Sequence, residues 1–413
     1  MRSERVVADT PRGAGGDKGE QTAKGAPSGG SGWAGRAAAA RAWAGTATGG
    51  AWLDAAWVWL VTRAIFVALT VLVPAMLTRG GGPSPLSRWG TQDGTLYAQI
   101  ALHGYGSPVA PMLWPLLPAL ERLLLPLTGG DPVPAGMLVA NAAFFGTLVL
   151  LRRLAEREVG PEAARRATWY LAIFPTAFYF FAPYSESLFL LLSIGAFGAT
   201  RARRWWLAGA LGCLAMLARS AGALLVVPFA VEFVAAWRAH AARWWQALWV
   251  LLIPAAAGIF SGYLALEHDD PLGWLHAAGL LGHTLHWPWD PFVFGIGELA
   301  HLSGVHTITA AHLVLNLLAA AVFVVLTVVA LRMLPLSYGL YSAAIVVFFL
   351  SLSEGMALFL AAGDGRYVLM IFPAFMVLGV WGRQRRLHEL LMVAMPVLMA
   401  ILAAHFLLLL AGG

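Results

Sequence analysis

The chain is poor in charged residues and in cysteine. Only 12% of its 413 residues are charged, about half the share found in soluble globular domains, and the mean hydropathy is +0.72. This scarcity of charge excludes an ordinary soluble domain and predicts many membrane spans. The single cysteine, Cys213, excludes a disulfide within the chain, and its place in an apolar run is typical of an inert buried thiol.

Several chemical motifs are also missing. No Walker-type loop and no dinucleotide fingerprint occurs, so a cytoplasmic nucleotide has no visible binding site. The sequence has no His-Glu-x-x-His helix and no Cys/His knuckle, so we expect no metal site and no cofactor. The pI of about 9.8 is compatible with nucleic-acid binding. However, the basic residues stand in short clusters between apolar runs, which is typical of cytoplasmic loops, and we expect no nucleic-acid partner.

The first 48 residues differ from the rest of the chain. They are rich in Gly, Ala, Ser and charge, and they show no apolar periodicity, so we expect a disordered tail. No apolar core follows the early charges, which argues against a signal peptide. Seven basic residues against four acidic ones favour a cytoplasmic position for this tail. Residues 49–413 are then expected to form one transmembrane domain.

Long apolar runs fill that domain. A helix of about 20 residues crosses the hydrocarbon core of a membrane. We therefore expect an all-α, polytopic membrane protein of about eleven transmembrane helices. The expected spans are 52–78, 133–152, 166–183, 186–200, 204–218, 221–237, 246–266, 309–332, 336–353, 366–381 and 388–410.

Clusters of arginine orient these spans. Arginines gather in loops near residues 152–166, 201–204, 238–243 and 383–386, and such loops face the cytoplasm under the positive-inside rule. The count of crossings is consistent only if the segment 111–127 does not span. Its prolines and the Glu121-Arg122 pair favour an interfacial or re-entrant helix. The loops at 79–112, 183–186, 267–308 and 353–366 then share the extracytoplasmic side.

Asp93 is the first candidate for chemistry. It lies in the polar stretch from Trp89 to Tyr105, and a carboxylate there could act as a general base towards an attacking hydroxyl. The alternative is a solvated aspartate or a helix cap, because Tyr97, Ile100 and Ala101 follow at helical spacing.

Glu186 and Arg219 form a second candidate. Glu186 enters an apolar helix at its first turn, where an acid complements the helix dipole and Ser185 could cap the helix. An ionisable group at a span end is also a functional hypothesis by default. Arg219 stands at the outer end of another span, and it could pair with Glu186 or bind an anionic head group.

Arg366 is the third candidate. It precedes a span on the outer side, against the positive-inside trend. A guanidinium in this position suits a lipid phosphate. The alternatives are snorkelling to the interface and pairing with Asp364.

The outer loop 267–308 carries acids, histidines and tryptophans, including Asp270, Trp274, Trp287 and Trp289. Tryptophan is common at membrane interfaces, yet these rings could also stack on sugars. His276, His283 and His286 show no firm metal-ligand spacing.

Together these segments resemble one family. The chain is similar to the PIG-V-like family, the mannosyltransferase 2 family of glycosylphosphatidylinositol assembly, in its bacterial branch of GT-C glycosyltransferases. Four blocks match in order, over roughly residues 52–385: Trp89 to Tyr105 with Trp114-Pro-Leu-Leu-Pro118; Tyr184-Ser-Glu-Ser-Leu-Phe189; Ala218-Arg-Ser-Ala-Gly222; and Gly365-Arg-Tyr-Val-Leu with Phe372-Pro373.

The chain departs from the family pattern at two places. The family's tryptophan and aspartate are adjacent, whereas three residues separate Trp89 from Asp93 here, and Gln92 stands in the tryptophan position. Ala221 replaces an asparagine of the third block. Neither change removes the acid, but both could alter substrate preference.

The resemblance implies a GT-C-like helical bundle in the plasma membrane, with its active site outside. Such enzymes move a hexose, here expected to be mannose, from a polyprenyl-phosphate donor to a hydroxyl of a glycolipid, lipoglycan or protein acceptor, with inversion. Asp93 would be the base. Arg366, Arg219 and Tyr367 would bind the donor phosphate. The expected substrate-binding residues are Trp89, Gln92, Tyr97, Tyr184, Glu186, Asp270, Trp274 and Trp287.

A transporter or lipid flippase is the alternative from another class. Transporters often show internal repeats and polar residues at mid-membrane. No repeat relates the two halves of this sequence, and its polar residues gather on one expected face.

Overall fold

The computed structural model describes residues 48–77, 84–282, 284–301, 307–352 and 364–408, and within these ranges all regular structure is helical. This confirms the all-α fold class. The chain divides into two units, residues 1–45 and 46–413. The expected tail 1–48 therefore lies, apart from its last residue, outside the described residues.

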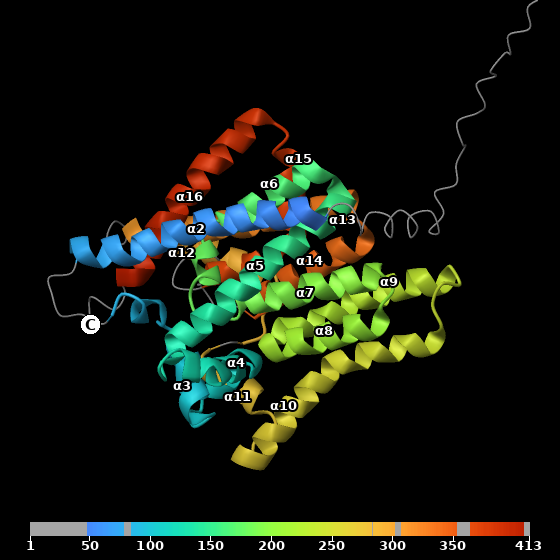
Figure 1. Cartoon of the computed structure of the whole chain (residues 1–413), viewed down its shortest axis with the longest axis horizontal. Helices are drawn as coiled ribbons and strands as arrows, with labels where there is room; N and C mark the ends of the chain where they lie inside the picture. The colour runs from blue at the N-terminus through green and yellow to red at the C-terminus, as the bar shows by residue number, and fades with distance from the viewer. Residues whose placement is uncertain (1–47, 78–83, 283, 302–306, 353–363, 409–413) are drawn as a thin grey trace, which may run out of the picture. The chain divides into compact units, whose positions relative to one another are not determined.

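The second unit is built from α-helices joined by short 3-10 turns (Figure 1). Those nearest the candidate site are α3 (Asp93–His103), α4 (Leu116–Leu124), α7 (Glu186–Arg201), α8 (Trp205–Ala218), η5 (Ser220–Leu225) and η7 (Asp364–Met370). The remaining α-helices are α2 (Thr48–Leu77), α5 (Pro132–Val159), α6 (Pro161–Ala172), α9 (Val226–Arg238), α10 (Leu252–His268), α11 (Gly273–Leu280), α12 (Asp290–His301), α13 (Thr307–Met333), α14 (Leu336–Ser351), α15 (Phe372–Trp381) and α16 (Arg385–Leu408). The other 3-10 turns are η1 (Ser87–Trp89), η2 (Ala110–Met112), η3 (Leu125–Leu127), η4 (Ala177–Phe180) and η6 (Trp244–Leu251).

Five of the described helical segments are long and apolar enough to cross a membrane: Gly50–Ala75, Pro132–Val159, Ser220–Arg238, Trp244–His268 and Arg385–Leu408. Shorter apolar helices cover Trp205–Ala218, Leu317–Met333, Leu336–Ser351 and Phe372–Trp381. These segments support a multi-pass membrane protein. The expected number of eleven spans is not confirmed.

The expected span 166–183 is not a single helix. The helix α6 ends at Ala172, and the chain turns before η4. Pro175 explains the break, because the residue before a proline is pushed out of the helical conformation and the proline itself has no N–H to donate. The turn brings the chain to Tyr184 and Glu186 as compact, buried backbone instead of a continuous span.

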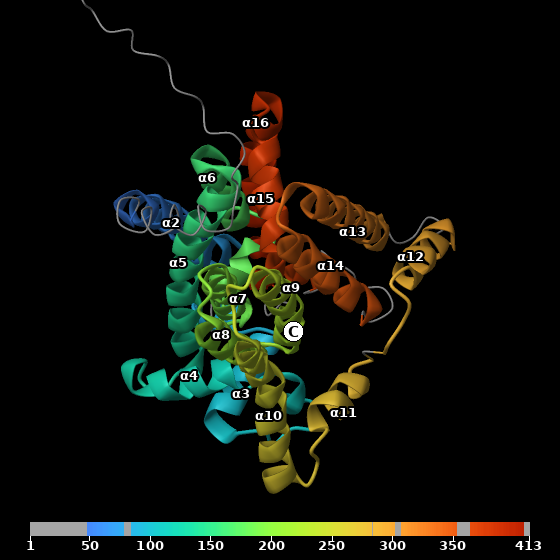
Figure 2. The same ribbon diagram turned by 90° about the vertical axis from the view of Figure 1, so that its right-hand side faces the viewer.

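Segment 111–127 contains only short helices. Its longest helix, α4, has nine residues, which corresponds to a rise of about 14 Å and less than half the thickness of the hydrocarbon core. In Figures 1 and 2, α3, α4 and α11 gather beside the end of α10.

Small residues allow the helices to approach closely. A Cβ added to Gly379 of α15 would overlap the carbonyl oxygen of Ala163 on α6, and one added to Gly209 of α8 would overlap that of Trp249 on η6. Such small-residue contacts are typical of helix packing in membranes. Between α5 and η4, Phe144 and Phe180 stack with ring centroids 4.3 Å apart.

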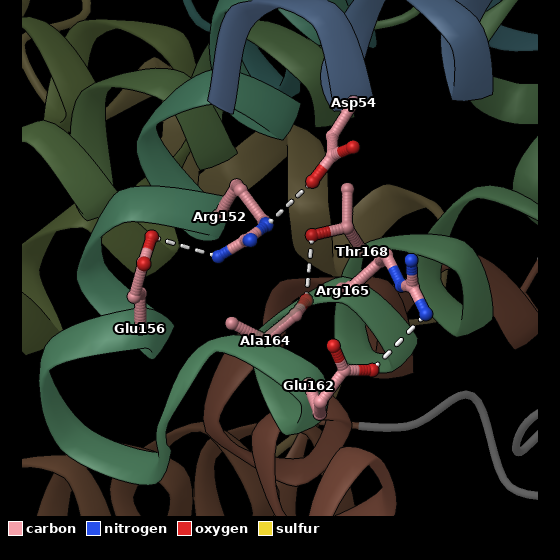
Figure 3. A network of polar contacts seen from close by, with 7 residues as sticks. All are labelled: Asp54, Arg152, Glu156, Glu162, Ala164, Arg165 and Thr168. Carbon is pink, nitrogen blue, oxygen red and sulfur yellow. Dashed lines mark hydrogen bonds and ion pairs between the residues drawn. The ribbon is translucent and has the colours of Figure 1, made fainter. Parts of the chain in front are cut away.

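Arginines at the expected cytoplasmic ends tie helices together. Arg152 of α5 lies 3.1 Å from Asp54 of α2 and 2.8 Å from Glu156 (Figure 3). Figure 3 also shows the exposed Arg165–Glu162 pair on α6, at 3.0 Å. Half-buried pairs of this kind anchor helices, whereas exposed ones contribute little.

A second group of charges joins four helices. Arg201 of α7 lies 3.0 Å from Glu158 of α5 and 3.3 Å from Glu232 of α9. Ser337, on α14, donates to Glu232 at 2.6 Å. The loop arginines used to orient the spans therefore also hold the bundle together.

Candidate functional site

Asp93 is the first residue of α3. The backbone enters this helix through Gln92, whose φ is +51°. Residues other than glycine seldom adopt a positive φ. Gly94, Tyr97, Ile100 and Ala101 form the buried face of the helix, so the helical spacing seen in the sequence is confirmed. The carboxylate lies at the positive end of the helix dipole, which stabilises its charge.

Asp93 pairs directly with Arg366. The Nη2 of Arg366 lies 2.6 Å from Oδ2 of Asp93, and the side chains are 8% and 20% exposed. Arg366 is held on η7, because the expected span 366–381 begins as a 3-10 turn and becomes α-helical only at Phe372, where Pro373 starts α15. The pair is thus buried on the arginine side and still reachable from the aspartate side.

Glu186 joins this pair to a second arginine. Its Oε1 lies 2.6 Å from Nη1 of Arg219 and 3.5 Å from Nε of Arg366. The Glu186–Arg219 pairing expected from the sequence is confirmed. Asp93, Glu186, Arg219 and Arg366, here named the charge quartet, bring together α3, α7, the start of η5 and η7, and their charges sum to zero.

Ser185 connects the quartet to α3. Its Oγ accepts from Nη1 of Arg219 and from the hydroxyl of Tyr97, both at 3.0 Å. The sequence suggested that Ser185 caps α7, but its side chain makes no cap hydrogen bond. The serine faces the arginine and the tyrosine instead, so this part of the interpretation was wrong.

Aromatic rings surround the two guanidinium groups. The Tyr367 ring centroid lies 5.4 Å from Cζ of Arg366 and 5.6 Å from Cζ of Arg219, and this ring stacks on Phe349 at 4.2 Å. Tyr184 lies 5.4 Å from Arg366 and donates its hydroxyl to the Thr91 carbonyl at 2.8 Å. Cation–π contacts of this kind hold guanidinium groups in place while leaving their edges free to donate.

Tyr97 and Tyr184 stay protonated. Burial raises the pKa of the Tyr97 and Tyr184 hydroxyls, because a phenolate would be poorly solvated there. Both side chains therefore act as hydrogen-bond donors at neutral pH.

Trp89 does not belong to this site. It is fully buried, its Nε1 donates to Oγ1 of Thr70 at 2.9 Å, and its ring packs against Phe66, Phe181 and Phe406. A ring with no exposed surface cannot contact a substrate. We therefore correct its expected substrate-binding role to packing of η1 against α2 and α16. Gln92, in contrast, is exposed beside Asp93.

The outer-loop residues Asp270 and Trp274 make their hydrogen bonds with residues outside the charge quartet. Asp270 accepts from the Leu272 amide at 3.2 Å and contacts Nδ1 of His276 at 2.9 Å, which orders the start of α11. Trp274 donates to Ser261 at 3.0 Å and packs near Trp114.

The two remaining tryptophans of this loop form a pair. Trp287 stacks on Trp289 with centroids 4.9 Å apart and an interplanar angle of 8°. Both rings are exposed, and this exposure suits contact with the membrane interface or with a sugar ring.

Sequence reasoning missed two features of the site. It did not foresee that Asp93 contacts Arg366, because the two are far apart in the chain. It also did not include Phe349 or Tyr179, whose ring centroid lies 5.8 Å from Cζ of Arg366, because both look like ordinary apolar-span residues. The side chain of Asp364, the other proposed partner of Arg366, lies outside the described residues. In the described part of the chain no group of three or more His, Cys, Asp or Glu side chains is placed to hold a metal ion.

The arrangement suits transfer of a group that leaves as an anion. It combines one partly exposed carboxylate, able to take a proton, with two arginines whose planar groups suit phosphate.

No known family model matches the sequence, and no curated protein matches it. Solved structures share parts of its backbone arrangement. ArnT from Cupriavidus metallidurans bound to undecaprenyl phosphate is 16% identical, with a TM-score of 0.49 over 84% of this chain and 64% of that one.

Two structures from Archaeoglobus fulgidus are also similar. The apo oligosaccharyltransferase is 13% identical, with a TM-score of 0.46 over 85% of this chain and 56% of that one. AglB in complex with an inhibitory peptide and a dolichol-phosphate is 12% identical, with a TM-score of 0.40 over 85% and 55%. The chain thus spans between 55% and 64% of the length of these proteins. A backbone similarity at these TM-scores carries no conclusion about function. The function proposed below rests on the geometry of the site itself.

Proposed function

We propose that this chain is a polytopic GT-C glycosyltransferase. It moves a hexose, with mannose as the expected sugar, from a polyprenyl-phosphate donor to an acceptor hydroxyl on the extracytoplasmic face of the plasma membrane. The observation that carries the proposal is the 2.6 Å contact of Asp93 with Arg366 inside a neutral quartet of charges.

The reaction is a single displacement. The acceptor oxygen forms a bond to the anomeric carbon while the bond from that carbon to the phosphate oxygen breaks, and the configuration inverts. The acceptor proton passes to Asp93, and the polyprenyl phosphate leaves with the bonding electron pair. Asp93 is suited to this role because its side chain is 20% exposed, so a hydroxyl can reach it.

The charge balance of the site favours this step. The quartet is neutral before the reaction and becomes singly positive when Asp93 takes the proton. At the same moment the departing phosphate gains a negative charge. Arginines held in place by Glu186 and Tyr367 stabilise that charge without having to reorganise, which is the usual source of large electrostatic rate effects.

The polar side chains around the quartet have supporting roles. Arg219, Arg366 and Tyr367 are assigned to the donor phosphate. Tyr97 and Tyr184 hold Ser185 and the Thr91 carbonyl in place, and so fix the entry to α3. Gln92 completes the substrate-binding set of this region, and the buried Glu186 supports substrate binding indirectly by orienting both arginines.

The test uses purified protein in lipid nanodiscs with labelled polyprenyl-phosphate mannose and a membrane lipid extract as acceptor. The proposal predicts labelled product whose new linkage is inverted relative to the donor. Movement of labelled donor across vesicle membranes without any sugar transfer would instead indicate the transporter or flippase alternative.

A further inference from the structure

A cavity of about 300 Å³ lies beside α3. Leu96, Gln99, Ile100 and His103 of the helix line it, together with Gly106 and Ser107 of the following loop. Its volume is at the lower end of the range of small-molecule sites. None of these residues belongs to the charge quartet.

The geometry of α3 places the cavity next to Asp93. Successive residues of an α-helix are rotated by about 100°, so positions 96, 99, 100 and 103 share one face. Asp93 precedes Leu96 by three residues and lies at the edge of that face. Tyr97, which is bonded to Ser185, lies on the other side of Asp93. Asp93, itself a member of the quartet, therefore lies at the edge of the helix face that lines the cavity.

The distances suit a molecule that reaches Asp93 from the cavity. With a rise of 1.5 Å per residue, the cavity face begins about 4.5 Å along the helix from Asp93 and ends about 15 Å from it. An inverting displacement needs its two substrates on opposite sides of the reacting carbon. Arg366 contacts the Asp93 carboxylate, whereas the cavity lies along the helix face that begins at Leu96.

The lining selects for a neutral, hydroxyl-rich ligand. Gln99, His103 and Ser107 offer both hydrogen-bond donors and acceptors, while Leu96 and Ile100 offer apolar surface for the C–H face of a sugar ring. No Asp, Glu, Lys or Arg is among the lining residues. An acceptor group that carries phosphate would therefore find no counter-charge here.

We propose that this cavity is the acceptor subsite and that it binds the uncharged glycan end of the acceptor. The inference rests on the proposed function, since it places the second substrate of the same reaction. The uncharged lining of the cavity favours a carbohydrate acceptor over a serine or threonine side chain of a protein.

Gly106 makes the cavity testable. A Cβ added to this residue meets no atom within 4 Å, and its φ lies outside the left-handed region, so a large side chain can fill the space without displacing packed atoms. Gly279, an exposed glycine of α11 with equally open surroundings, is not part of the lining and provides the matched control.

The experiment measures sugar transfer from labelled polyprenyl-phosphate mannose to octyl α-mannoside in nanodiscs. Gly106→Phe is expected to raise the acceptor KM at least about tenfold, which corresponds to about 1.4 kcal/mol of lost binding. Gly279→Phe should leave both KM values within about twofold. A second variant, Gln99→Ala with His103→Ala, removes exposed side chains only and is expected to raise the acceptor KM with the donor KM unchanged.

Three results would overturn the subsite. In the first, Gly106→Phe and the double variant leave the acceptor KM unchanged. In the second, the wild-type protein transfers no sugar to octyl mannoside. In the third, the wild-type protein uses an octyl-tailed serine/threonine peptide as acceptor instead. Transfer to the lipid extract that needs Asp93 but ignores the cavity variants would refute the subsite and retain the proposed function. No transfer to any acceptor would refute both.

Discussion

Glu186 lies with its Oε1 2.6 Å from Nη1 of Arg219, and its side chain is completely buried. A buried carboxylate is stable only when its charge is paired. The same oxygen faces Nε of Arg366 at 3.5 Å. Glu186 is therefore the link through which the two arginines are held at one place.

Replacing Glu186 by Gln should leave two arginine charges with one remaining acid. We expect a loss of about 3–5 kcal/mol in the free energy of unfolding, measured by thermal unfolding in detergent. The double variant Glu186→Gln with Arg219→Gln should recover part of this loss. Strictly additive effects of the two substitutions would show that the pair is not coupled.

Arg366→Lys should weaken the site without unfolding it. The guanidinium of Arg366 faces Asp93 and Glu186 through different nitrogens, and an ammonium is a point charge without that fork. We expect the donor KM to rise about tenfold or more in the sugar-transfer assay. Arg385→Lys, at a 90% exposed residue, is the control. Equal behaviour of both variants would contradict the role given to Arg366.

Glu121 predicts a dependence of stability on pH. It is fully buried on α4, both carboxyl oxygens lack a hydrogen-bond partner among the described residues, and burial raises its pKa to about 9 from an ordinary 4.5. Between these pH values the unfolded chain releases the proton while the folded chain keeps it. Unfolding is therefore favoured by about 1.4 kcal/mol per pH unit from this group as pH rises through that window.

Glu121→Gln removes that contribution. Thermal unfolding of the wild type from pH 5 to pH 9 should show a steeper fall than that of the variant, because glutamine does not titrate. Parallel curves for the two proteins would mean that Glu121 ionises normally in the folded chain.

The backbone at Gln92 carries strain that glycine should relieve. Its φ of +51° costs a side-chain-bearing residue about 1–3 kcal/mol. Gln92→Gly is expected to raise the free energy of unfolding by about 1 kcal/mol, and Gln92→Val to lower it. Urea unfolding of both variants checks the order, and the reverse order would show that the side chain of Gln92 stabilises the turn by contacts of its own.

The sequence predicted local features more reliably than tertiary ones. The helix after Asp93 follows from the spacing of Tyr97 and Ile100, and the Glu186–Arg219 pair follows from two charges at the outer ends of neighbouring spans. The first signal is a short-range sequence pattern, and the second follows from both charges being on the same expected side of the membrane. The contact of Asp93 with Arg366 depends on how η7 folds back on α3, which no local pattern contains.

The errors have physical causes. Hydropathy alone joined 166–183 into one span, because apolar residues continue past Pro175 while the helix cannot. Trp89 was assigned to the substrate through the family resemblance of the block Trp89 to Tyr105, yet Phe181 and Phe406 bury its ring. Ser185 has the residue type and position of a helix cap, but its hydroxyl oxygen accepts hydrogen bonds from Arg219 and Tyr97 and makes no cap hydrogen bond.

The rate of sugar transfer by Asp93→Asn tests the proposed role of Asp93 as general base most directly. Asparagine keeps the size of the side chain and cannot accept the acceptor's proton, so kcat should fall by about 10²–10⁴-fold with little change in donor KM. Asp269→Asn is the matched control, since Asp269 is exposed at the end of α10 with a φ of +53°, which asparagine tolerates well. Wild-type kcat in Asp93→Asn would contradict the assignment of Asp93 as the base.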